Sequence, residues 1–383
     1  MLKKIALLIP LISFVHCKNP PARQAVKPDL KSIMTDFDHT IQKYINSDST
    51  QQSISFAVMH KDRILWSKAF GYADKENNIH ADTSTIYRTG SISKSFTAFL
   101  MMQLVGKGLL KLNDPVESYL PEIRRLKGYN DSTKITFLQL ATHSSGLERE
   151  PELADAADGP ISSWEQKVLA AIPETSFESR PGTNFNYSNI GYAILGLALS
   201  RAAGQPFMTL MEENIFTPLQ MNNTCYIVPP EKFTKLAKGR SKAFGQLDLA
   251  TPQREHFGRG YKVPNGGIYS TPNDLSKFIM AELGVFPLLN ANALATIQTG
   301  KLSASGEAKY GLGLYIYAYD NKILIHHSGS VAGYSAEMDF EKNSEYGVAI
   351  MCNYNTVGEM LGFYAQQLLD QLSALDDTAA PHG

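Results

Sequence analysis

Ser91 and Lys94 stand three residues apart, just before the long apolar run from Phe96 to Leu110. The run is too apolar for a surface helix and predicts a buried one. Residues i and i+3 share one face of a helix, so the serine hydroxyl and the lysine amine can meet. Burial disfavours a charged lysine, so Lys94 could serve as the base that activates Ser91 as a nucleophile. The alternative is that Ser91 is only a helix N-cap.

Such chemistry also needs a proton shuttle to the leaving group, and Tyr187-Ser188-Asn189 offers a phenol and a carboxamide two residues apart. The positive charge of a nearby lysine would lower the pKa of Tyr187 by favouring its phenolate. The alternatives are an aromatic side chain that merely lines a cleft and, for Asn189, the N-cap of the next helix.

A third motif, His326-His327-Ser328-Gly329-Ser330, is predicted at the end of a strand and before a turn from Ser330 to Gly333. A strand edge can present backbone N–H groups to a bound carbonyl, and a glycine allows a substrate backbone to approach closely. The alternative is a turn between strands that carries a surface histidine.

Together the three motifs resemble those of the penicillin-recognising serine hydrolases, which are S-x-x-K, Y-x-N and K/H-T/S-G. The matching residues are Ser91-Ile92-Ser93-Lys94, Tyr187-Ser188-Asn189 and His327-Ser328-Gly329. The family includes class C β-lactamases and serine D-alanyl-D-alanine carboxypeptidases. The resemblance extends from about residue 30 to residue 372. It includes 57–72, 142–147, 266–271 and 310–313.

The resemblance implies roles for the reacting groups. Ser91 would be the acylated nucleophile, and Lys94 and Tyr187 would share the general base and acid work. The backbone N–H groups of Ser91 and Ser330 would form the oxyanion hole. No metal or organic cofactor is implied.

The resemblance also implies how the substrate is held. Asn189 would bind the substrate amide, and Gly329 would lie beside the substrate. His327 and Ser328 would hold a substrate carboxylate or the proton network of Tyr187. Two arginines, Arg254 and Arg259, are candidates for reading a terminal carboxylate.

The third motif begins with His327, whereas class C β-lactamases usually have lysine there. Histidine is similar to one type of D-Ala-D-Ala carboxypeptidase and to several D-amino-acid peptidases and esterases. A Glu-x-x-Leu-Asn stretch, as used for deacylation in class A β-lactamases, does not occur. The resemblance therefore favours hydrolysis of peptides that contain D-amino acids, such as a cell-wall stem peptide. Small-ester or amide hydrolysis is the next alternative, then β-lactam hydrolysis, then a penicillin-binding sensor or scaffold without turnover.

The elements that must position these motifs predict an α+β fold: an antiparallel sheet built from both ends of the chain, flanked by the terminal helices, around a mostly helical insert. This expected arrangement resembles the β-lactamase/transpeptidase-like architecture. The expected strands are 54–60, 64–70, 310–319, 322–326, 334–340 and 346–352. The expected helices include 29–44, 135–142 (N-cap Thr133), 162–172, 190–202, 272–283 and 357–372.

The chain has 383 residues and a net charge of −1, which gives no reason to expect a nucleic-acid partner. Lys3 and Lys4 precede a short apolar run and then Cys17, which predicts a secretory signal over 1–17. It is similar to a lipoprotein signal, with ordinary cleavage or an uncleaved anchor as alternatives. We expect an exported protein, periplasmic or anchored by a lipid on Cys17, that acts on a small molecule or peptide. A tether (18–28), the hydrolase domain (29–372) and a polar tail (373–383) would follow.

The two cysteines of the predicted hydrolase domain, Cys225 and Cys352, lie far apart in the sequence. We expect two buried free thiols in preference to a disulfide.

Overall fold

The computed structural model describes residues 29–376 except 49, 51, 244, 306, 307 and 320. The predicted signal, the tether, Cys17 and the end of the predicted tail lie outside the described residues. None of the helices in the described part is both long and apolar enough to cross a membrane. Cys225 and Cys352 are free thiols, as expected, but only Cys352 is buried, whereas Cys225 is half-buried.

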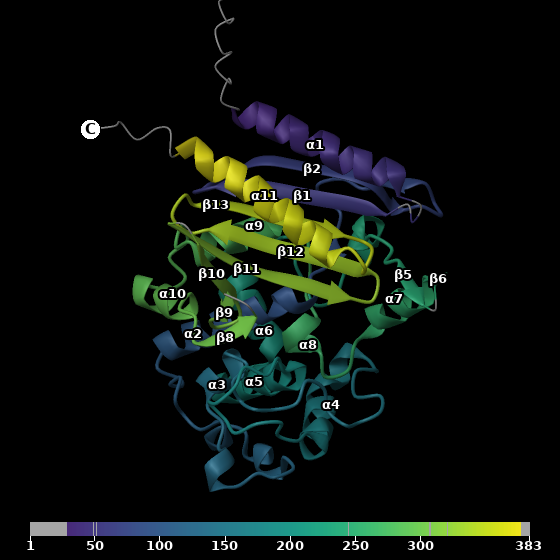
Figure 1. Ribbon diagram of the computed structural model, residues 1–383. Coiled ribbons are helices and arrows are strands. Elements are labelled where there is room, and N and C mark those ends of the chain that lie inside the picture. The colour runs from purple at the N-terminus through teal and green to yellow at the C-terminus, as the bar shows by residue number, and fades with distance from the viewer. Residues whose placement is uncertain are drawn as a thin grey trace, which may run out of the picture.

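A large antiparallel sheet is built from both ends of the chain, as predicted (Figure 1). Strand β1 from the N-terminal part pairs directly with β13 from the C-terminal part, with Ala57 opposite Ala349. In spatial order the strands are β3 (Ile79–His80), β2 (Arg63–Asp74), β1 (Ser53–His60), β13 (Tyr346–Cys352), β12 (Tyr334–Glu341), β11 (Lys322–Val331), β10 (Tyr315–Tyr319), β9 (Ala308–Tyr310) and β8 (Leu302–Ser305).

The two terminal helices, α1 (Leu30–Ser47) and α11 (Gly358–Asp376), cover one face of this sheet (Figure 1). In α1 the buried residues Ile33, Phe37 and Ile41 recur at helical spacing and pack on that face. The repeat of apolar residues every three or four positions thus explains why α1 is a helix and which side it buries.

The opposite face carries α9 (Pro272–Glu282) and the helical insert. Helix α2 (Ser93–Gly106) is buried on nearly all sides, as its uniform apolarity predicts. Residues Gly90–Ile92 form a single 3₁₀ turn that leads into α2. The other helices are α3 (Phe137–Ala141), α4 (Trp164–Ala171), α5 (Asn189–Ala203), α6 (Phe207–Met211), α7 (Ala250–Arg254), α8 (Val263–Gly266) and α10 (Ala291–Ile297).

Two short strand pairs lie outside the large sheet. Strand β4 (Tyr87–Arg88) pairs with β7 (Tyr269–Ser270), and so positions the chain that enters the Gly90 turn. Strands β5 (Ser241–Ala243) and β6 (Gln246–Asp248) form the other pair.

Three local predictions were wrong. The strand predicted over 310–319 is two strands, because the chain turns between β9 and β10 and Gly313 there has a φ of 75°. Helix α3 is capped by Thr136, which accepts from Gln139 N, and not by Thr133. The strand predicted to end at His326 continues to Val331, since β12 pairs with it throughout.

Candidate active site

The predicted contact between Ser91 and Lys94 is present. Lys94 Nζ lies 3.0 Å from Ser91 Oγ and donates a second hydrogen bond to Asn265 O at 3.2 Å. Ser91 is half-buried in the 3₁₀ turn, and no side chain caps the start of α2. The N-cap alternative for Ser91 therefore does not apply, and its hydroxyl is aligned with the amine.

The buried position of Lys94 favours a neutral amine. Burial lowers the pKa of Lys94 well below its usual value, and the positive charge of Arg149 acts in the same direction. Glu150 opposes this shift only in part. A neutral amine carries a lone pair that can accept the Ser91 proton, which is what nucleophile activation requires.

Tyr187 lies beside this pair, with Lys94 Nζ 4.7 Å from the centre of its ring. The expected pKa shift of Tyr187 was wrong in sign: desolvation raises its pKa, and a hydrogen bond with Ser91 opposes the rise only partly. The prediction considered the lysine charge and left out the desolvation. Tyr187 is consequently a neutral phenol that can donate a proton.

His143, for which the sequence suggested no role, holds Tyr187 in place. Its carbonyl accepts from Asn186 N at 2.7 Å, and its Nδ1 accepts from Ser188 N at 3.0 Å. The His143 and Tyr187 rings lie 4.2 Å apart. His143 has a φ of 55°, a strained conformation for a residue with a side chain. Its fixed backbone and ring clamp the residues on both sides of Tyr187.

The backbone of the third motif approaches the Ser91 turn closely. A Cβ atom on Gly329 would collide with Thr89 O and lie 3.2 Å from Ser91 N, and one on Gly90 would lie 2.7 Å from Ser330 N. Only glycine at both positions allows this approach. It brings the backbone nitrogens of Ser91 and Ser330 into one neighbourhood, where an oxyanion hole would require them.

His327 is buried, with both ring nitrogens engaged. Its Nδ1 lies 2.7 Å from Ser328 O, and its Nε2 lies 3.1 Å from the Tyr310 hydroxyl. Burial, with a smaller effect of Lys94, lowers the pKa of His327 to about 3. A neutral, fully hydrogen-bonded ring gives no positive charge for a substrate carboxylate, so of its two expected roles only the support of the proton network fits.

The side chains of the third motif alternate between the two faces of the sheet. His327, Gly329 and Val331 are buried, whereas Ser328 and Ser330 are exposed and line a separate cavity together with His326. The surface-histidine alternative fits neither histidine. At Ser328 and Ser330 the backbone is the part that lies near Ser91.

Asn189 begins α5, and Ser188, not Asn189, is the N-cap, because its Oγ accepts from Gly191 N. The Asn189 carboxamide donates to Glu150 Oε1 at 2.6 Å. Glu150 also accepts from the Tyr261 hydroxyl and pairs with Lys262 at 3.0 Å. This network around Glu150 was missed in the sequence because its residues come from three distant loops.

Of the two arginines suggested by the sequence, Arg259 lies near the site, where its positive charge helps to lower the pKa of Lys94, and Arg149 is a further arginine beside Tyr187. Arg259 forms an ion pair with Glu255 at 2.9 Å, and burial lowers its pKa to about 10. Arg254 is exposed at the end of α7. Arg149 is exposed, lies 4.8 Å from the Tyr187 ring centre, and within the described residues no acidic side chain pairs with it.

The fold and this constellation define a serine hydrolase of the penicillin-recognising type. The chain belongs to the beta-lactamase family, whose model matches residues 37–371.

Two curated relatives support this assignment. The chain is 28% identical over 351 residues to beta-lactamase-like protein 4 of Dictyostelium discoideum, covering 84% of this chain and 60% of the relative. It is 30% identical over 237 residues to the D-alanyl-D-alanine-carboxypeptidase/endopeptidase AmpH of Escherichia coli K12, covering 61% of this chain and 58% of the relative. The chain thus spans less than two thirds of either protein.

Solved structures confirm the fold. The octameric penicillin-binding protein homologue from Pyrococcus abyssi is 25% identical and matches with a TM-score of 0.74, covering 88% of this chain and 77% of that one. A class C beta-lactamase is 22% identical and matches with a TM-score of 0.75, covering 88% of this chain and 96% of that one.

Proposed function

We propose that this protein hydrolyses peptides that contain D-amino acids, through an acyl-enzyme on Ser91. The observation that carries the proposal is the 3.0 Å contact between Ser91 Oγ and the amine of Lys94, whose pKa burial lowers well below its usual value. Ser91 O–H donates its proton to Lys94 as the oxygen attacks the scissile carbonyl, and the Ser91–carbonyl bond forms. Tyr187, as a neutral phenol, donates a proton to the leaving amine as the scissile C–N bond breaks, and it recovers a proton from Lys94. A water molecule then attacks the Ser91 ester, which releases the acid product and returns a proton to Ser91.

Arg149 supports a substrate with a free carboxylate. Its exposed guanidinium lies 4.8 Å from the ring centre of Tyr187, the proposed acid for the leaving group, and it has no acidic partner in the described structure. A charge-assisted hydrogen bond to a terminal carboxylate would orient a D-amino acid for release. The carboxypeptidase named among the relatives is consistent with this substrate class.

Small-ester hydrolysis is the second candidate, and a cavity of about 620 Å³ favours it. Aromatic and aliphatic side chains line most of this cavity, including Tyr226, Phe233 and Phe257. It shares Lys262 with the Glu150 network. An apolar acyl or alcohol group would fit this environment better than a peptide stem would.

A substrate panel distinguishes these candidates. Wild type and Ser91→Ala are assayed with a D-Ala-D-Ala peptide, a p-nitrophenyl ester and a chromogenic cephalosporin. We expect the peptide to give the highest kcat/KM, with all turnover lost in Ser91→Ala. Higher kcat/KM for the ester would favour the second candidate, and a stable penicillin adduct without turnover would favour a binding protein.

Export and lipid attachment remain predictions from residues 1–17, which lie outside the described residues. We propose that a lipid on Cys17 anchors the protein at the cell envelope. Cys17→Ser should move the protein from the membrane to the soluble fraction of cells that express the full chain. An unchanged membrane fraction would contradict the anchor.

A further inference from the structure

A second cluster of chemically active side chains lies on the face of the sheet that α11 covers. There, a cavity of about 520 Å³ opens between β11, β12 and α11. Its polar lining includes His326, Glu337, Asp339 and Glu359. Among the described residues that line it there is no lysine or arginine.

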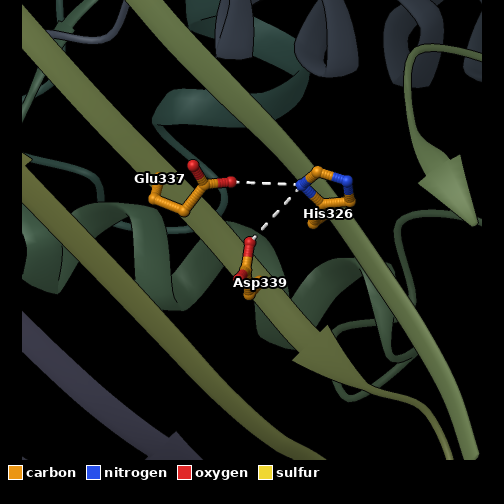
Figure 2. Close-up of side chains that lie close together, drawn as sticks. All are labelled: His326, Glu337 and Asp339. Atoms are coloured by element: carbon orange, nitrogen blue, oxygen red, sulfur yellow. Dashed lines mark hydrogen bonds and ion pairs between the residues drawn. The ribbon is translucent and has the colours of Figure 1, made fainter. Parts of the chain in front are cut away.

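Strand register explains why three of these side chains converge. His326 on β11 lies directly opposite Asp339 on β12, and Glu337 is two residues from Asp339 and so points to the same face. Figure 2 shows both carboxyl groups directed toward the same ring nitrogen of His326. Gly362 of α11 leaves room for the Glu337 carboxyl, since a Cβ there would lie 3.3 Å from Oε2.

The distances within the cluster suit a metal ion. His326 Nδ1 lies 3.1 Å from Glu337 Oε1 and 3.8 Å from Asp339 Oδ1, and one ligand atom of each residue lies within 4.8 Å of the others. Tetrahedral ligands at zinc bond lengths are separated by about 3.3 Å. The three atoms can therefore surround one small cation with only slight side-chain adjustment.

No lysine or arginine among the described lining residues balances the charge of the Glu337 and Asp339 carboxyl groups. The side chains of Glu337 and Asp339 are each only 3% exposed, and Asp339 Oδ1 has no hydrogen-bond partner although it faces the cluster. Buried carboxylates without a paired charge are strongly destabilising, so such groups are usually protonated, paired with a cation or bound to a metal.

We propose that His326, Glu337 and Asp339 bind one divalent transition-metal ion of the zinc type, with Glu359 or water completing the coordination. One imidazole with carboxylate oxygens suits zinc or its neighbours, whereas calcium and magnesium prefer oxygen ligands alone. The ion would join β11 to β12 behind the strand edge that carries Gly329 and Ser330. It takes no part in the reaction at Ser91, which lies on the other face of the sheet.

The test is metal binding by the full chain. The protein is freed of metal with EDTA, titrated with zinc by calorimetry, and titrated in parallel with cobalt(II) to record its visible spectrum. We expect one zinc per chain and a cobalt spectrum of mixed nitrogen and oxygen ligation. Glu337→Gln and Asp339→Asn should each weaken zinc binding by at least about 100-fold, more than is usual for loss of a mere supporting contact.

Two matched variants serve as controls. Glu282→Gln changes another buried carboxyl, which has no histidine beside it, and should bind zinc like wild type. Ser91→Ala should also bind zinc normally, so the result is independent of the hydrolase proposal. Absence of saturable zinc binding in wild type would overturn the proposal, as would unchanged affinity in the folded Asp339→Asn variant. The two carboxyl groups would then share a proton instead.

Discussion

The two faces of β11 carry consecutive histidines in opposite environments. His327 faces the Ser91 side, with both ring nitrogens bonded and Lys94 nearby, and burial holds it neutral. His326 faces α11, where Glu337 and Asp339 approach it. Because side chains alternate along a strand, neighbours in one motif can belong to two different sites. Within the described part of the chain, the proposed nucleophile, base and acid all lie on the His327 side.

The sharpest way to separate the two faces is to remove the nucleophile. Ser91→Ala should lower kcat by at least about 10⁴-fold, because the acyl-enzyme cannot form, while zinc affinity stays the same. Steady-state kinetics and calorimetry on the same preparation check both. Residual turnover at the wild-type rate would mean that the chemistry lies elsewhere.

The next largest effect is expected on substitution of Lys94, the proposed base on the Ser91 face of the sheet. Lys94→Arg replaces an amine that can lose its proton with a guanidinium that stays protonated, so it cannot accept the Ser91 proton and kcat should fall about 10³-fold. In wild type, kcat/KM should rise with pH as Lys94 loses its proton at its lowered pKa, and then stay level. Lys107→Arg, on an exposed lysine just after α2, is the matched control and should behave as wild type. Equal activities of both variants would contradict a base at Lys94.

A smaller effect tests the substrate class. Arg149→Gln should raise KM about 10-fold for a peptide with a free carboxylate, through loss of a charge-assisted hydrogen bond. KM for a neutral p-nitrophenyl ester should not change. Arg254→Gln, the matched change at an exposed arginine on α7, should alter neither substrate. A rise of KM for both substrates would show that Arg149 supports Tyr187 and does not read the carboxylate.

Glu282 on α9 is a third buried carboxyl. In the described structure neither a histidine nor a second acid pairs with it, so it shows how burial of a carboxyl changes the free energy of unfolding. Burial raises its pKa to about 8, so between pH 4.5 and 8 the folded state binds more protons than the unfolded state. Its contribution to stability is therefore greatest at low pH and is lost as the pH rises to 8. Glu282→Gln should reduce the fall of unfolding free energy from pH 5 to pH 9 by on the order of 2 kcal/mol. Urea unfolding at a series of pH values measures this free energy. Parallel curves of unfolding free energy against pH for wild type and Glu282→Gln would contradict the raised pKa of Glu282.

Much of the fold was predictable because its signals are local. The apolar repeat in α1, the uniform apolarity of α2 and the alternation in β12 indicated helices and a strand near their observed places. The interruption of the strand over 310–319 was missed, since Gly311 and Gly313 are compatible with both a strand and a turn.

In the site, the three motifs were predictable because each is contiguous in sequence. Asn265, Glu150 and Arg149 were not, since segments that meet only in the fold bring them to Lys94, Asn189 and Tyr187. The sign of the Tyr187 pKa shift was missed for a related reason, because desolvation depends on tertiary packing. The His326 cluster depends on the register of β11 and β12, which the sequence alone leaves open.

The central claim is the acyl-enzyme on Ser91, and intact-mass spectrometry tests it most directly. The protein is mixed with a D-Ala-D-Ala peptide or a penicillin, quenched in acid during turnover, and digested to locate the adduct. We predict one added acyl group per chain on Ser91, and none in Ser91→Ala. Hydrolysis without any adduct, at equal rates in wild type and Ser91→Ala, would contradict the account.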